Sequence, residues 1–171
     1  PNTGGMGAYS PAPIITKTVE KKILKNIIEP TISIMRKKKK PFKGILYAGV
    51  IIKHNEPKLI EYNVRFGDPE CQVLMRRLGG QILDVILDSL QGNLAHSQIN
   101  WARDAAIAIV MAAKGYPESY KKGTRINNIK AVEQISGIKV FHAGTIEQDG
   151  KLISNGGRVL NITCRDETLV M

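Results

Sequence analysis

Residues 58–70 read KLIEYNVRFGDPE, and this stretch decides most of the expected fold. Lys58 to Arg65 has the alternation of a β-strand, and the breaker Phe66-Gly67-Asp68-Pro69 ends it. Upstream, Gly44 to Lys53 is rich in β-branched and aromatic residues, and the turn-like residues 54–57 separate the two runs. The stretch therefore predicts the second strand of an antiparallel hairpin, with a helical pattern starting after the breaker.

The same strand carries the densest group of chemically capable side chains. Glu61, Asn63 and Arg65 would project from one face, because side chains alternate along a strand. A carboxylate and an amide oxygen about 7 Å apart are hard oxygen ligands that suit Mg²⁺, and an arginine beside them would neutralise phosphate that the metal leaves uncovered. An ordinary Glu–Arg pair on a solvated strand face is the alternative, and the pattern alone does not decide between them.

Helices are expected on both sides of the hairpin. Thr16 is a predicted N-cap for an apolar stripe repeating every four residues, which Pro30 interrupts or kinks. After the breaker, apolar spacing predicts a helix from Leu74 to Gly92, weakened by Gly79-Gly80. The glycine- and proline-rich opening, Pro1 to Pro13, is expected to be a loop.

The second half of the chain has the pattern of short strands. Ala105 to Ala113 is a continuous apolar run that predicts a buried strand. Further elements are expected as strands at 140–146, 151–154 and 158–163, a helical turn at 132–135, and the start of a helix at 165–171. We therefore expect an α+β fold with a helix-containing part, residues 1–92, followed by a small, mainly antiparallel β part, residues 93–171.

Composition narrows the class of protein. The chain has 171 residues, 43% hydrophobic, and a formal net charge of +10. Such a charge suits either an anionic small-molecule substrate or a nucleic acid. The densest basic run, Arg36 to Lys40, is interpreted as a solvated segment, because no aromatic residues interleave with it as base stacking would require. A basic nucleic-acid-binding module remains the alternative function.

The number and spacing of the cysteines and the lengths of the apolar runs indicate the cellular compartment in which the protein is expected. Cys71 and Cys164 lie far apart without metal-ligand spacing, which favours a reducing, cytoplasmic setting. The longest apolar run has nine residues, too short for a membrane span of about 20. The chain begins with Pro1 and no signal-peptide pattern follows, so we interpret it as a piece of a longer protein.

Two glycine-containing segments are candidate anion sites. Gly4-Gly5-Met6-Gly7 would let backbone amides approach a ligand closely, and Gly157-Arg158 would present a cation from a turn. Each pattern is weak alone, because glycine turns are also common in plain hairpins.

Six further blocks occur in the chain in a fixed order: Pro1–Pro13, Gly44–Gly49, Glu61–Glu70, Gly115–Pro117, Phe141–Thr145 and Asn155–Leu160. Together they resemble the phosphoribosylamine-glycine ligase family of the ATP-grasp superfamily. The resemblance extends over nearly the whole chain and implies the later half of an ATP-grasp module followed by most of a small C-terminal domain, with an N-terminal part of the same enzyme outside this sequence.

This resemblance implies an ATP-dependent ligation of glycine to 5-phosphoribosylamine in purine biosynthesis, with no nucleic-acid or membrane partner. It implies that Glu61 and Asn63 bind Mg²⁺ or Mn²⁺ and that Arg65 acts at the ATP phosphates as the catalytic and nucleotide-binding cation. Arg158 would meet the ribose 5-phosphate. The residues implied on the phosphoribosylamine and glycine side are Gly4, Gly5, Met6, Gly7, Asp68, Glu70, Gly157 and Arg158. Because an ATP-grasp site lies between two halves, the chain by itself is expected to be catalytically silent.

Overall fold

The computed structural model describes residues 1–167, which form two compact units. The first unit is assembled from residues 1–10, 68–79 and 100–167. The second unit contains residues 11–67 and 80–99. The α+β class is confirmed, since helices accompany sheets in which every described strand pair is antiparallel. Neither unit is a continuous segment, so the boundary expected after residue 92 stays a prediction about the family's domains.

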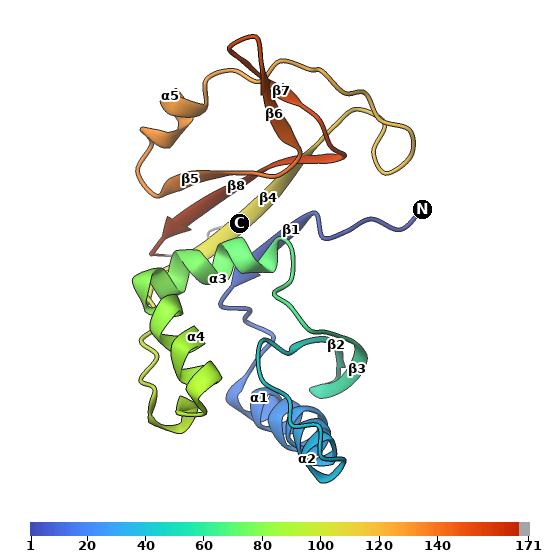
Figure 1. The fold of residues 1–171 in the computed structure, drawn as a ribbon, viewed down its shortest axis with the longest axis vertical. Helices are drawn as coiled ribbons and strands as arrows, with labels where there is room; N and C mark the ends of the chain where they lie inside the picture. The colour runs from blue at the N-terminus through green and yellow to red at the C-terminus, as the bar shows by residue number, and fades with distance from the viewer. Residues whose placement is uncertain (168–171) are drawn as a thin grey trace. The chain divides into compact units, whose positions relative to one another are not determined.

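The first unit is built on a four-stranded sheet in the order β1-β4-β8-β5 (Figure 1). A separate hairpin of β6 and β7 and the short helix α5 belong to the same unit, and α3 packs along β1 and β4. The bounds are β1 (Gly7–Ser10), α3 (Glu70–Leu78), β4 (Ala105–Ala112), α5 (Ile129–Glu133), β5 (Ile138–His142), β6 (Thr145–Gln148), β7 (Lys151–Ser154) and β8 (Arg158–Asp166).

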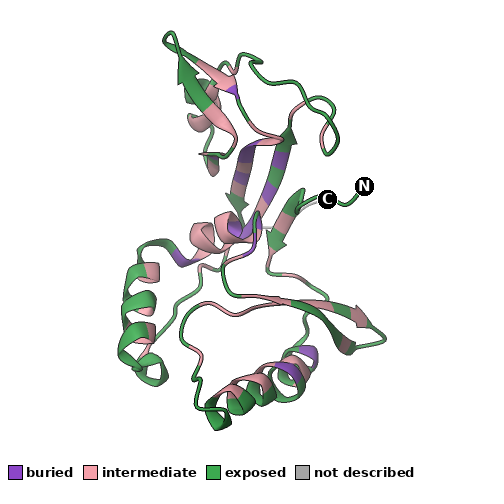
Figure 2. Ribbon diagram, turned by 45° about the vertical axis from the view of Figure 1, so that its right-hand side comes forward, coloured by how far each residue is buried: buried purple, intermediate pink, exposed green. Residues whose placement is uncertain are grey.

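The core of this unit follows from the alternation of β4. Ala106 and Ala108 are buried against Val73 of α3, because small residues let the helix approach the sheet closely. A second cluster, Val140, Val159 and Leu160, joins β5 to β8. Figure 2 shows the buried residues concentrated on these central strands.

Arg77 fastens α3 to the neighbouring segments of this unit. Its guanidinium donates to the carbonyls of Asp104 at 3.1 Å and Ala102 at 2.9 Å and to the Ser10 hydroxyl at 2.7 Å. It also stacks over the Trp101 ring, 5.4 Å from the centroid. The rigid fork of an arginine suits such a multiple contact.

The second unit joins a long helix to the predicted hairpin. The helix runs through α1 (Lys17–Ile23), the π-helical η1 (Leu24–Ile28) and α2 (Glu29–Lys37), and the hairpin consists of β2 (Tyr47–Lys53) and β3 (Glu56–Asn63). The Thr16 cap is confirmed, because its hydroxyl accepts from the Val19 amide at 3.3 Å. The remaining helices of this unit are α4 (Ile82–Gln91) and the 3-10 turn η3 (Leu94–His96).

Pro30 changes the helix type without ending the helix. It lies at the start of α2, where a missing N–H is tolerated, and a π-helical turn precedes it. The Ile27 carbonyl of that turn accepts from the hydroxyls of Thr31 and Tyr62, both at 2.9 Å. The hairpin therefore satisfies a backbone acceptor of the helix. The basic run Arg36 to Lys40 is exposed where α2 ends, where cations favour the negative end of the helix dipole.

Four expectations need correction. The opening segment is not all loop, since β1 pairs with β4. The helix expected from Leu74 to Gly92 is broken by the 3-10 turn η2 (Gly79–Gln81), where Gly79 has a φ of 59° that other residues rarely adopt. Residues 140–146 form two strands rather than one. Arg165 and Asp166 continue β8 because they pair with β4, and Glu167 after them is a bend, while residues 168–171 of that expected helix lie outside the described residues.

Candidate functional site

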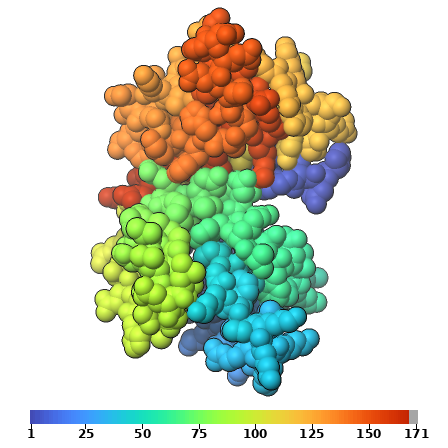
Figure 3. Space-filling view, viewed as in Figure 1, coloured from blue at the N-terminus to red at the C-terminus, as the bar shows by residue number. Residues whose placement is uncertain are grey.

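Three segments of the first unit meet at one end of its sheet. Because β1 and β8 both run antiparallel to β4, the chain just before β1, just after β4 and at the start of β8 lies at that same end. The Gly4–Gly7 segment, the Gly115–Pro117 block and Gly157–Arg158 are thus neighbours. Figure 3 shows the blue N-terminal segment beside the yellow-orange segment that follows β4.

Arg158 is the centre of this cluster. Its Nη1 donates to the carbonyls of Gly5 at 3.1 Å and Asp68 at 2.8 Å, and its Nη2 pairs with the Asp68 carboxylate at 2.9 Å. The side chain keeps 26% of its surface exposed. The arginine therefore joins the glycine segment to the start of α3, and its side chain stays partly exposed to solvent.

The glycines leave the room that these contacts need. A Cβ on Gly4 would lie 2.7 Å from Arg158 Cζ, and one on Gly5 would lie 2.5 Å from Pro69 Cδ. Real Cβ atoms do not approach other atoms so closely. A side chain at Gly5 would clash with the Asp68-Pro69 corner, and a side chain at Gly4 would force the Arg158 guanidinium to move away.

Met6 and Gly7 have a different environment from Gly4 and Gly5. Gly7 begins β1, and the Met6 carbonyl accepts from the Val110 amide at 3.0 Å. These two residues therefore connect the glycine segment to the sheet.

Tyr116 makes a further contact with the glycine segment. The Gly4 amide donates to its hydroxyl at 3.3 Å, and a Cβ on Gly157 would lie 2.4 Å from its ring. The tyrosine thus packs on one end of β8 and reaches the segment before β1. Tyr116 belongs to the Gly115–Pro117 block, whose sequence pattern predicts no role for it.

The Cys71 thiol lies near Asp68 at the start of α3. Cys71 lies in the first turn of α3, where burial raises the pKa of its thiol and the negative charge of Asp68 raises it further. Glu70 begins the same helix, where an acidic side chain complements the positive end of the helix dipole. The two carboxylates thus flank the start of α3.

The predicted metal residues lie together on the hairpin of the second unit. The Asn63 amide nitrogen donates to the Glu61 carboxylate at 3.0 Å, so the two side chains point to the same place. Gly49 is paired with Glu61, and its missing side chain leaves room, because a Cβ there would be 3.2 Å from Glu61 Cγ. Tyr62 contacts the helix instead, as strand alternation requires.

Arg65 lies outside this strand. β3 ends at Asn63, and the Arg65 guanidinium donates to the Phe66 carbonyl at 2.8 Å. Strand alternation therefore does not place Arg65 on the face of Glu61 and Asn63, although it remains an exposed cation two residues after the strand ends.

The oxygen ligands present fit a divalent cation that is shared with substrate. A carboxylate and an amide are hard ligands, and Mg²⁺ commonly takes one or two protein oxygens and completes its shell with phosphates and water. Among residues 1–167, no group of three or more His, Cys, Asp or Glu side chains gathers as a self-sufficient metal cage. A divalent cation at Glu61 and Asn63 would need further oxygen ligands from substrate or water to complete its shell.

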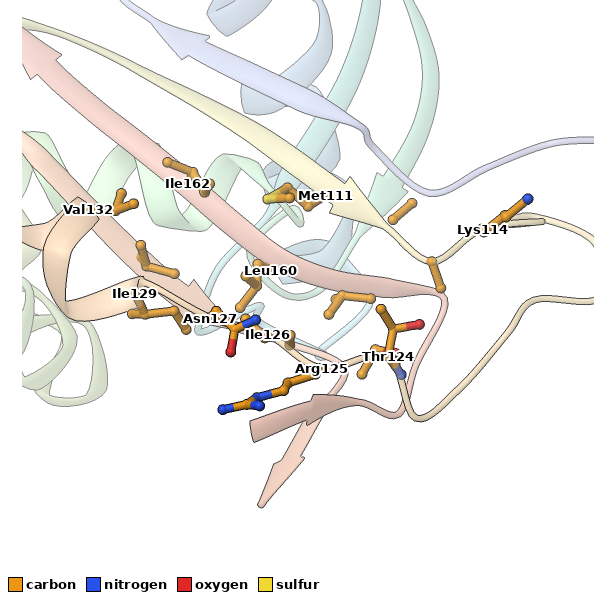
Figure 4. A pocket seen from close by; sticks show the side chains of 15 residues that line it. Met111, Lys114, Thr124, Arg125, Ile126, Asn127, Ile129, Val132, Leu160 and Ile162 are labelled. Carbon is orange, nitrogen blue, oxygen red and sulfur yellow. Dashed lines mark hydrogen bonds between the residues drawn. The ribbon is translucent and has the colours of Figure 1, made fainter. Parts of the chain in front are cut away.

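A cavity of about 460 Å³ lies elsewhere in the first unit (Figure 4). It opens between β8, β5 and the segment leading to α5, with Ile129, Val132, Leu160 and Ile162 among its walls and Arg125 at its edge. Its lining is mainly aliphatic and also includes Lys114, Thr124, Arg125, Asn127 and Ser154. The Arg158 cluster is preferred as the candidate site because a guanidinium and a glycine backbone, two groups that suit an anion, meet in it.

None of the helices described for residues 1–167 combines the length and hydropathy that crossing a lipid bilayer requires.

Comparisons with known proteins connect both sites to one family. Residues 1–71 match the model of the phosphoribosylglycinamide synthetase ATP-grasp (A) domain, and residues 106–171 match the model of its C domain. The phosphoribosylamine–glycine ligase of Agrobacterium fabrum is 53% identical over 163 residues, which is 95% of this chain and 38% of that protein. The chloroplastic enzyme of the same name from Arabidopsis thaliana is 48% identical, over 99% of this chain and 32% of its own length.

A solved structure gives the same result. The crystal structure of phosphoribosylamine–glycine ligase from Thermotoga maritima superposes with a TM-score of 0.83 at 34% identity, covering 98% of this chain and 40% of that one. The chain spans about 40% of the length of most of the curated relatives that it matches. It therefore belongs to the phosphoribosylglycinamide synthetase family, and it carries parts of both the ATP-grasp domain and the C domain.

Proposed function

We propose that this chain forms the later ATP-grasp part and the C domain of an ATP-dependent ligase that joins glycine to 5-phosphoribosylamine. The observation that carries the proposal is the Arg158 cluster, in which segments separated by up to 153 residues hold a cation against a glycine backbone. Such a combination suits an anionic substrate group. The names of the relatives supply the reaction.

In the proposed reaction, the glycine carboxylate attacks the γ-phosphoryl group of ATP, and ADP leaves. The amine of phosphoribosylamine then attacks the carbonyl carbon of the glycyl phosphate and releases phosphate, which gives glycinamide ribonucleotide. Anionic reactants must approach a polyanion, so the protein has to supply positive charge and fixed positions. This chain requires no covalent nucleophile of its own.

Each predicted residue has a role in this scheme. Glu61 and Asn63 would hold Mg²⁺ or Mn²⁺, and the bound cation would neutralise negative charge on the ATP phosphates. Arg65 would contact the ATP phosphates. Arg158, beside the Gly4–Gly5 backbone, would receive the ribose 5-phosphate, and Asp68 would lie on the same phosphoribosylamine and glycine side. Met6, Gly7, Glu70 and Gly157 would shape the same region.

The contacts of Arg158 add a second task to its proposed one. Because both of its terminal nitrogens already bond to Gly5 and Asp68, substitution would loosen the loop as well as remove a cation. Arg158→Ala should raise the KM for phosphoribosylamine much more than the KM for ATP or glycine. Equal increases for all three substrates would indicate a general structural role.

The test of the function uses a chimera in which this sequence replaces the matching segment of the Agrobacterium fabrum relative. Glycinamide ribonucleotide and phosphate release are measured with glycine, ATP and freshly prepared phosphoribosylamine, and the parent enzyme is the control. We expect a rate within about tenfold of the parent, a barrier difference of ~1.4 kcal/mol. A folded chimera that forms no product would contradict the proposal.

The proposed cellular setting is the cytoplasm, with small molecules rather than nucleic acid or membrane as partners. The 171-residue chain alone should release no phosphate above background, because the proposed nucleotide site needs both halves of the ATP-grasp module.

A further inference from the structure

Tyr116 connects two parts of the Arg158 cluster that are far apart in sequence. Its hydroxyl accepts the Gly4 amide at 3.3 Å, across 112 positions of the chain. Its ring lies against Gly157, where a Cβ would come within 2.4 Å of Cδ2 and 2.7 Å of Cε2. The residue next to Gly157 is Arg158, the first residue of β8, so two consecutive residues accommodate the ring and supply the cation.

Gly4 is therefore held from two sides. The Arg158 guanidinium lies where a side chain on Gly4 would be, its Cζ 2.7 Å from the position of a Cβ, and the Tyr116 hydroxyl accepts a hydrogen bond from the Gly4 amide. The next residue, Gly5, gives its carbonyl to Arg158. A glycine backbone has wide conformational freedom, so these contacts are what restrict this segment to one arrangement.

We propose that Tyr116 is a positioning residue for the substrate-phosphate region: its hydroxyl fixes Gly4 so that the Gly4–Gly5 backbone and Arg158 are preorganised for an anion. Tyr116 acts through Gly4 and needs no contact with the substrate. The inference rests on the proposed function for the identity of that anion, the phosphate of phosphoribosylamine. Preorganisation matters because binding an anion to a mobile loop costs the conformational entropy that the loop loses when it becomes ordered.

The chain offers a matched control. Tyr120 is a second tyrosine in the same segment, with its ring centroid 6.3 Å from that of Tyr116. Its ring would also meet a Cβ on Gly157, at 3.2 Å, but the bond to the Gly4 amide belongs to Tyr116. Tyr116→Phe removes the hydroxyl and keeps the ring, and Tyr120→Phe makes the same chemical change beside it.

The first experiment follows exchange of the Gly4 amide hydrogen by NMR in the 171-residue chain. Tyr116→Phe should speed this exchange about threefold to tenfold, the range expected for loss of one hydrogen bond. Tyr120→Phe should leave it unchanged. Equal exchange in the unsubstituted chain and in Tyr116→Phe would overturn the inference, as would equal acceleration in the two variants.

The second experiment measures steady-state kinetics in the chimera. Tyr116→Phe should raise the KM for phosphoribosylamine about threefold to tenfold and leave the KM for ATP unchanged, whereas Tyr120→Phe should change neither. A uniform fall in kcat with all KM values unchanged would overturn the positioning role. If the unsubstituted chimera is folded but inactive, the proposed function fails, and the exchange experiment still decides whether Tyr116 holds Gly4.

Discussion

The contact between Gly157 and Tyr116 allows a quantitative prediction for Gly157→Ala. Gly157 does not have a positive φ, so its backbone accepts alanine without strain. The destabilisation expected for the variant is therefore steric. The new methyl would lie 2.4 Å and 2.7 Å from two ring carbons of Tyr116. Carbon atoms pack at about 3.5–4.0 Å, so the ring must move by roughly 1 Å.

Two costs follow from that movement. Overpacking of this kind destabilises by about 1–3 kcal/mol. The Tyr116 bond to Gly4 is already 3.3 Å long, so a shift of the ring would break it, at a cost of about 1 kcal/mol. The expected total is about 2–4 kcal/mol, equivalent to a fall in Tm of roughly 4–16 °C for a chain of this size.

Thermal unfolding followed by circular dichroism measures this change. Gly80→Ala is the control. A Cβ on Gly80 would meet no atom of the described residues within 4 Å, and Gly80 does not have a positive φ. A double-mutant cycle with Tyr116→Ala should show strong coupling, since removing the ring makes room for the methyl. The steric argument would be refuted if Gly157→Ala were as stable as Gly80→Ala, or if the cycle were additive.

Three further predictions concern other parts of the chain. In the chimera, Glu61→Gln keeps the shape of the side chain but removes its charge, so the Mg²⁺ concentration for half-maximal rate should rise at least about tenfold; unchanged metal dependence would exclude Glu61 as a ligand. Arg77→Ala removes three hydrogen bonds from a half-buried guanidinium and should lower the free energy of unfolding by about 2–4 kcal/mol in a urea titration, with partial recovery in Arg77→Lys. In a Cys164→Ser background, the Cys71 thiol should react slowly with iodoacetamide near pH 8 because its pKa is raised, and Asp68→Asn should speed the reaction by lowering that pKa; an unchanged rate would show that the Asp68 charge does not act on the thiol.

The sequence pattern was sufficient to predict those strands and helices that are determined by neighbouring residues in the chain. The hairpin of β2 and β3 follows from two β-branched and aromatic runs around a turn, and β4 follows from one apolar run. The pairing of Glu61 with Asn63 follows from strand alternation. Six ordered blocks were enough to indicate the family, because order and spacing of several motifs are far more specific than any one glycine pattern.

Local pattern failed where pairing with a distant segment decides the structure. The glycine-rich opening has little strand propensity, yet it forms β1 because β4 offers it an edge. Arg165 and Asp166 continue β8 for the same reason, since their partners are Ala106 and Ala105 of β4. The position of Arg65 beyond the strand also depends on where pairing with β2 stops.

The sequence by itself thus determined the residue types of the candidate sites, the local elements that carry them and the family. Only the tertiary structure decided that Gly4, Asp68, Tyr116 and Arg158 meet, and that the arginine is already bonded within the protein. The physical reason is the register of an antiparallel sheet. It brings the starts of β1 and β8 to the end of β4, and no local propensity contains the information about which distant strands will pair.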